Sequence, residues 1–151
     1  MRGFIVIVGI LVAIGLFVYC GVGNWLLNRD TTAVLERAQV AANAEDMLGY
    51  VVQLENNMVE HRMTEGHAAV IFRTPANDME LIFKTVTRIK ERLEIVELLP
   101  QSDTTYQVAL DDLRGTLREL DVCAGGWFWA TRGWWMMLIS IFGLIVAIFK
   151  A

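Results

Sequence analysis

Two long apolar segments stand near the ends of the chain and enclose a charged middle. Residues 4–27 read FIVIVGILVAIGLFVYCGVGNWLL without a charged side chain, and as a helix these roughly 24 residues would extend about 36 Å. Residues 134–149 read WWMMLISIFGLIVAIF, about 16 residues or 24 Å, and reach spanning length when extended back through residues 127–129. We therefore expect two transmembrane anchors, at 1–27 and 125–151, around an extramembrane domain at 28–124.

The middle domain has helical periodicity almost throughout, and no alternating segment is long enough to predict a strand. We expect an all-α fold in which the two transmembrane helices flank an antiparallel bundle of three to four helices. The apolar stripes are narrow, so they also suit a coiled coil with another subunit. Three stripes repeat at helical spacing: Val40, Ala44, Met47, Val51, Leu54, Met58 and His61; Met79, Ile82, Val86, Ile89, Leu93 and Val96; and Tyr106, Leu110, Leu113, Leu117 and Leu120.

The path of the chain limits how these helices connect. A chain that leaves the membrane near residue 28 and returns near 124 must traverse the domain an even number of times. Either the first helix is long and residues 64–73 run back toward the membrane, or it breaks, for instance at Gly49, and gives a four-helix bundle. The first stripe continues across Gly49, which favours the long helix. Residues able to cap a helix precede each stripe: Thr31 or Thr32, Asn77 or Asp78, and Ser102 or Asp103.

Charge separates the domain from the anchors. All 17 acidic residues and ten of the 13 basic residues lie within 28–124, which leaves this segment a formal charge of about −7. The net charge of the whole chain is −4 and no two basic residues are adjacent, so we expect no nucleic-acid partner.

The orientation follows from the basic residues at the chain ends. Arg2 and Lys150 favour two cytoplasmic termini and a domain outside, although four arginines on the domain side count against this. We expect a bacterial or archaeal inner (plasma) membrane. Removal of residues 1–23 as a signal peptide is the alternative, because Gly21 and Gly23 are small residues before a possible cleavage site. The apolar run continues to Leu27, which favours an uncleaved anchor.

Two kinds of residue within the anchors suggest how the two helices pack and at what depth they lie in the membrane. Small residues at a spacing of four permit close helix approach, and aromatic rings with a nearby arginine favour the depth of the lipid headgroups. The predicted packing residues are Gly9, Ala13, Gly143 and Ala147. The predicted interface anchors are Trp25, Trp127, Trp129, Arg132, Trp134 and Trp135.

One cluster could hold a metal ion. Met58, His61, Met63 and His67 combine thioether and imidazole groups, which suit copper. Each residue also has a simpler interpretation, as a position of the first stripe or as a polar turn residue, and we expect neither a metal nor a cofactor. Cys20 and Cys123 would differ by about 13 Å in membrane depth, too far for a disulfide.

No nucleophile motif, phosphate loop or zinc-protease motif occurs, so we expect no enzyme. The order of anchor, helical domain and anchor resembles the sensory half of bacterial chemoreceptors and related four-helix-bundle sensors. Such receptors continue into signalling modules, whereas this sequence stops at Lys150-Ala151. The resemblance therefore implies a ligand-sensing module that passes its signal to a separate partner. Our first hypothesis is instead a structural or accessory subunit, whose bundle docks on other membrane proteins or on copies of itself.

Overall fold

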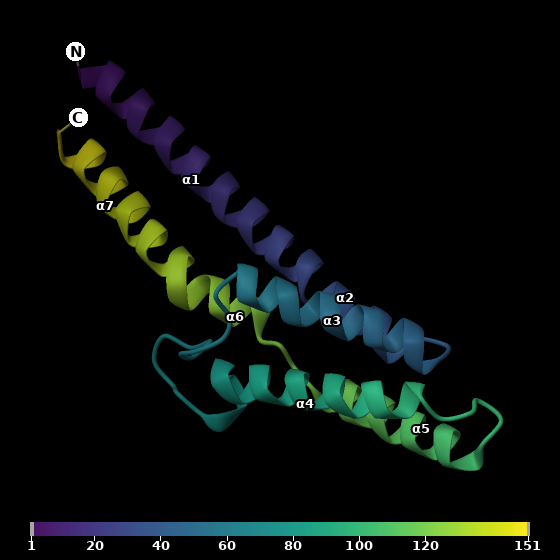
Figure 1. Ribbon diagram of the computed structural model, residues 1–151. Coiled ribbons are helices and arrows are strands. Elements are labelled where there is room, and N and C mark those ends of the chain that lie inside the picture. The colour runs from purple at the N-terminus through teal and green to yellow at the C-terminus, as the bar shows by residue number, and fades with distance from the viewer. Residues whose placement is uncertain (1, 151) are drawn as a thin grey trace.

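An apolar pair of helices and a four-helix bundle make up the computed structural model, which describes residues 2–150 and the side chains of 7–143 and 145. The chain is all-α as predicted, and within 2–150 the only β-type pairing is a single bridge between His67 and Asp78. In Figure 1, α1 and α7 extend together from one end of the bundle formed by α2 to α5. The helices are α1 (Arg2–Asp30), α2 (Thr32–Gln39), α3 (Ala44–Glu60), α4 (Met79–Glu97), α5 (Thr104–Glu119), α6 (Ala124–Phe128) and α7 (Trp134–Lys150), with a 3-10 turn at Pro75–Asn77 and a π-helical turn at Trp129–Gly133.

The bundle core is built from the predicted stripes. The six residues of the second stripe are all buried on α4, and four of the five of the third stripe are buried on α5. Asp78 and Asp103 cap these two helices: Asp78 accepts from the backbone N–H of Glu80 at 3.0 Å, and Asp103 accepts from that of Thr105 at 2.8 Å. The connection between α4 and α5 is short and the two helices are antiparallel, as the sequence predicts.

The prediction of a long first helix was wrong. The chain turns between α2 and α3, so the domain is a four-helix bundle, and the break lies at residues 40–43 rather than at Gly49. Asn43 begins α3 by accepting from the backbone N–H of Asp46 at 2.7 Å. The turn is held against α5, because Arg114 donates to the carbonyl of Ala41 at 2.7 Å. Val40, the first residue of the predicted stripe, is 77% exposed.

Residues 64–73 do not form the returning segment that the long helix required. α3 itself runs back toward the apolar helices, and an irregular loop then leads to α4 (Figure 1). The loop begins with Arg62 in the left-handed region, at φ 58°, and bends again at Gly66, at φ 89°. It is ordered by backbone pairing with the start of α4, since the N–H of Met79 donates to the carbonyl of Gly66 at 2.9 Å.

α1 continues into the bundle almost without interruption. The N–H of Thr31 donates to the carbonyl of Leu27 at 3.0 Å, and that of Leu35 donates to Thr31 at 2.9 Å. Thr31 makes no side-chain cap. Its buried hydroxyl donates back to the Leu27 carbonyl at 2.7 Å, a contact that tends to bend a helix. Helical hydrogen bonding therefore continues from the apolar helix α1 into α2 of the bundle.

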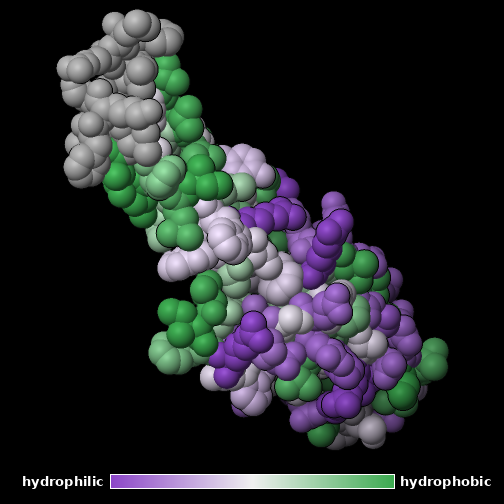
Figure 2. Space-filling model, turned by 90° about the vertical axis from the view of Figure 1, so that its left-hand side faces the viewer, coloured by the Kyte–Doolittle hydropathy of each residue, from purple (hydrophilic) through white to green (hydrophobic). Residues whose placement is uncertain are grey.

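Among the described residues, one helical stretch is long and apolar enough to cross a membrane by its length and composition. It runs from Ile7 to Gln39, through α1 and α2, and contains an 18-residue window with a mean hydropathy of 2.1. α7 has 17 residues, and a second span stays a prediction. Figure 2 shows the contrast with the bundle: the part of the protruding helices that carries hydropathy colours is mostly green, whereas the bundle surface is mostly purple. Phe17 on α1 is 81% exposed.

Candidate functional site at the junction of the apolar helices and the bundle

α6 packs between α1 and the loop that precedes α4. A Cβ atom placed on Gly23 of α1 would lie 2.8 Å from the Phe128 ring, and one placed on Gly126 would lie 2.5 Å from the carbonyl oxygen of Ala68. Real Cβ atoms do not approach other atoms so closely, so glycine is required for this packing. The three segments thereby form one closely packed junction.

The backbone at the junction departs from regular helix in two places. Cys123, which precedes α6, is left-handed at φ 48°, and its N–H donates to Asp121 at 2.8 Å. The turn Trp129–Gly133 is π-helical, and the hydroxyl of Thr131 donates to the carbonyl of Trp127 at 2.7 Å. Within residues 2–150, Arg62 and Cys123 are the non-glycine residues with positive φ, and Trp129–Gly133 is the π-helical turn. Such points gather at functional sites.

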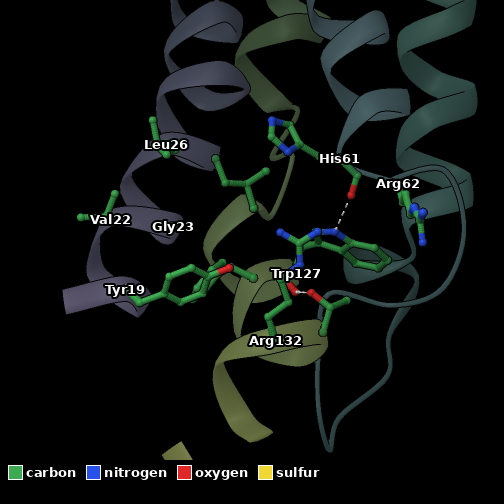
Figure 3. Close-up of a pocket in the computed structure, with 11 residues that line it drawn as sticks. Tyr19, Val22, Gly23, Leu26, His61, Arg62, Trp127 and Arg132 are labelled. Carbon is green, nitrogen blue, oxygen red and sulfur yellow. Dashed lines mark hydrogen bonds between the residues drawn. The ribbon is translucent and has the colours of Figure 1, made fainter. Parts of the chain in front are cut away.

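A cavity of about 370 Å³ opens at this junction, and we name it the junction cavity. α1 supplies an apolar wall, and the end of α3 with the start of the C-terminal helical segment supplies the other walls (Figure 3). In Figure 3 the Tyr19 ring points inward and the Arg132 side chain rises toward Trp127. The lining residues are Tyr19, Val22, Gly23, Leu26, Leu27, His61, Arg62, Trp127, Phe128, Thr131 and Arg132.

Hydrogen bonds tie the end of α3 to α6 and to α1. Trp127 donates its indole N–H to the carbonyl of His61 at 3.3 Å, and Nε2 of His61 lies 3.4 Å from the carboxylate of Asp30. Asn57 donates to the carbonyl of Asp30 as well. The pKa of Asp30 is held below its ordinary value of 3.8, chiefly by the hydrogen bond from Arg29, with His61 adding to the effect while partial burial opposes it.

Arg62 and Arg132 are the two arginines that line the junction cavity, and Figure 3 shows Arg132 rising from the C-terminal helical segment. No ion pair or hydrogen bond joins its guanidinium to another of the described side chains. The other walls are largely apolar. This arrangement suits an apolar group with an anionic end better than it suits proton transfer or nucleophilic attack.

The residues of the predicted copper-type cluster lie in different surroundings. Met58 and Met63 are fully buried in the core. His61 faces Asp30, whereas Nε2 of His67 lies 3.8 Å from the carboxylate of Asp78. Among the described residues, no group of three or more His, Cys, Asp or Glu side chains is placed to hold a metal ion.

The two cysteines are both free. Cys20 is buried on α1, with its sulfur 3.7 Å from that of Met136 on α7. Cys123 instead contacts the carbonyl of Ala76 at 3.6 Å, and burial, with the neighbouring Asp121, raises the pKa of its thiol.

The predicted packing residues of the anchors are placed differently on the two helices. On α1, Gly9 and Ala13 are half-buried. On α7, Gly143 is exposed and a Cβ placed there would meet nothing within 4 Å. The side chain of Ala147 lies outside the described residues. The two helices pack against each other, and one described side-chain contact between them joins Cys20 to Met136.

The predicted interface anchors all lie near the junction. The guanidinium of Arg29 stacks 5.4 Å from the ring centre of Trp25. Trp127 is half-buried in the junction cavity, and Arg132 is exposed. The remaining three side chains are exposed by 43% for Trp129, 38% for Trp134 and 64% for Trp135.

Sequence reasoning missed the junction cavity itself. Its walls come from segments far apart in the chain, and the π-helical turn and the left-handed Arg62 leave no plain mark in the sequence. The one available signal was the pair Gly125 and Gly126 before Trp127, which marks a close approach of two backbones.

No protein-family model, curated protein or solved structure matches this chain.

Proposed function

We propose that the protein is a small two-span membrane protein, whose outer bundle acts as a structural or accessory subunit of a larger membrane assembly. The observation that carries the proposal is the exposure of large apolar side chains around α1 and along α7. Ile10, Leu11, Val12 and Phe17 are exposed by 47%, 63%, 55% and 81%, and Phe142 of α7 by 69%. A surface of this kind requires an apolar environment.

The second span begins before α7. Helical structure runs from Ala124 through the π-helical turn to Lys150, and these 27 residues would extend about 40 Å at 1.5 Å per residue. α1 and α7 extend in the same direction from the bundle (Figure 1). Both can therefore enter one bilayer from the same side, with both termini on the cytoplasmic side and residues 28–124 outside.

The bundle offers surface for a protein partner at its far end. The α2–α3 turn and the α4–α5 connection lie opposite the apolar helices (Figure 1). Each carries an exposed apolar side chain, Val40 at 77% and Leu98 at 84%. Apolar patches rimmed by polar side chains are typical of docking surfaces, and we take Val40 and Leu98 as the apolar positions of such a surface. This favours a role in binding other membrane subunits or a second copy of the chain.

The test is to extract the full chain gently from its native membrane and identify what comigrates with it. An accessory subunit should migrate in a defined larger complex. The double variant Val40→Ser with Leu98→Ser should release it from that complex, while Val59→Ser, at a site 55% exposed elsewhere on the bundle, should not. A chain that migrates alone as a monomer contradicts the proposal.

A second candidate function is ligand sensing with a signal passed to a separate partner. It is favoured by the junction cavity together with the continuous path of α1 into α2 through Thr31. A ligand that changes the junction would act directly on the helix that enters the membrane. A small molecule that raises the melting temperature of the full chain, and fails to do so for Tyr19→Ala, would support this function.

A further inference from the structure

The loop between α3 and α4 carries three consecutive exposed apolar side chains. Val70, Ile71 and Phe72 are exposed by 45%, 73% and 80%. They lie in irregular backbone, outside any helix. A run of this kind is unfavourable in water and marks a contact surface.

The base of this loop is fixed at the end of the bundle where the apolar helices begin. The ring of Trp127 would lie 3.5 Å from a Cβ placed on Gly66, and the carbonyl of Ala68 packs against Gly126. In Figure 1 the loop projects sideways beside α6. Figure 2, in which the left-hand side of Figure 1 faces the viewer, shows a green apolar patch next to the pale band between the apolar helices and the bundle. The loop therefore lies near the level at which α1 and α7 would enter a bilayer.

The charge of the loop differs from that of the rest of the domain. Residues 61–74 contain Arg62 and Arg73 against the single acid Glu65, whereas the domain as a whole is strongly acidic. Both arginines are exposed, and neither forms an ion pair with another described side chain. Exposed cations beside apolar side chains complement the phosphates and acyl chains of a lipid surface.

We propose that residues 69–73 insert into the interfacial layer of the bilayer that α1 and α7 span, with Ile71 and Phe72 among the acyl chains and Arg73 at the phosphates. The proposal rests on the two-span arrangement proposed above. The loop then forms a third attachment, which sets the rotation and tilt of the bundle on the membrane surface. A rigid attachment of this kind would fix which face of the bundle is presented to a partner.

The test places the photo-crosslinking residue benzoylphenylalanine singly at three positions of the full chain, reconstituted in liposomes of phosphatidylcholine and phosphatidylglycerol. The positions are matched in exposure: Phe17 on α1 at 81%, Phe72 in the loop at 80%, and Leu98 at the far end of the bundle at 84%. At such exposed sites the replacement removes little packing. Mass spectrometry after illumination identifies lipid and protein adducts at each site.

Lipid adducts at Phe17 and Phe72, with none at Leu98, are the expected result. Lipid adducts at Phe17 alone would overturn the insertion of the loop and leave the two spans standing. A crosslink from Phe72 to a second copy of the chain, in place of lipid, would overturn it in favour of a protein contact. An absence of lipid adducts at Phe17 would show that the two-span arrangement itself has failed.

Discussion

The apolar helix pair and the bundle use the same residue types in opposite ways. In the bundle, Leu54 and Leu93 are fully buried at stripe positions, and polar side chains cover the outside. On α1, Leu11 and Phe17 are 63% and 81% exposed. A stripe makes one face of a helix apolar, whereas the helix pair is apolar nearly all round. The bundle therefore excludes water by its own packing, whereas the exposed apolar surface of the helix pair supports the proposal that this pair lies in a bilayer.

Truncating a leucine should affect the two regions very differently. Leu93→Ala removes a fully buried side chain from the bundle core and should lower the free energy of unfolding by about 2–5 kcal/mol. Leu11→Ala, at a 63% exposed site, should change it by less than about 0.5 kcal/mol. Urea unfolding of the full chain in mild detergent, followed by circular dichroism, measures both. Equal losses would contradict the comparison.

A charge added to the apolar helix pair should have a larger effect than the same charge added to the bundle surface. Leu11→Asp places a carboxylate within the proposed first span, and we expect membrane insertion to cost about 2.5–3.5 kcal/mol more. Leu98→Asp, at a site 84% exposed on the bundle, should leave insertion unchanged. The fraction of chain that resists alkaline extraction from membranes reports insertion. If Leu11→Asp inserted as well as Leu98→Asp, α1 would not be a span.

Two glycines distinguish the junction from the bundle surface. Gly126→Ala forces a Cβ to within 2.5 Å of the Ala68 carbonyl oxygen, and because a backbone atom yields little, we expect a loss of about 1–3 kcal/mol. Gly49→Ala meets nothing within 4 Å on α3 and should stabilise the chain by roughly 0.5–1 kcal/mol. The same urea titration gives both values. A stabilising Gly126→Ala would refute the close approach of α6 to the loop.

We expect the stability of the fold to depend weakly on pH through Asp30, which lies where the helix pair meets the bundle. The pKa of Asp30 is lowered from 3.8, chiefly by Arg29. A lowered pKa in the folded state means that this carboxylate stabilises the fold at pH values above 3.8, and that the stabilisation is lost as the pH falls through the lower folded value. Asp30→Asn should therefore flatten the acid limb of the melting-temperature profile. An unchanged acid limb would show that Asp30 is not coupled to its neighbours.

The sequence predicted α4 and α5 well because several local signals agree there. The stripe of each helix is uninterrupted, an aspartate precedes each first turn, and Pro100 separates them. The turn between α2 and α3 was missed because Val40 stands at stripe spacing from Ala44 by coincidence, with neither glycine nor proline to mark the turn. The overlooked signal was Asn43, a residue type that caps helices, followed by the acidic residues Glu45 and Asp46 in the first turn.

The junction could not be predicted in the same way. Trp127 and Arg132 were expected at a membrane surface from their residue types, but the cavity that they line requires the approach of α6 to both α1 and the loop. That approach depends on tertiary contacts of Gly23 and Gly126 and on a π-helical turn. None of these follows from periodicity, which reports only the face that each helix buries.

The central claim is that both apolar helices span one bilayer, with the bundle on one side and both termini on the other. Protease protection of the full chain, with an epitope tag added at each end, tests it in sealed right-side-out vesicles. A protease outside should cut the exposed connection between α4 and α5, and both tags should survive until detergent opens the vesicles. Loss of either tag from sealed vesicles would place that terminus on the same side as the bundle and contradict the two-span arrangement.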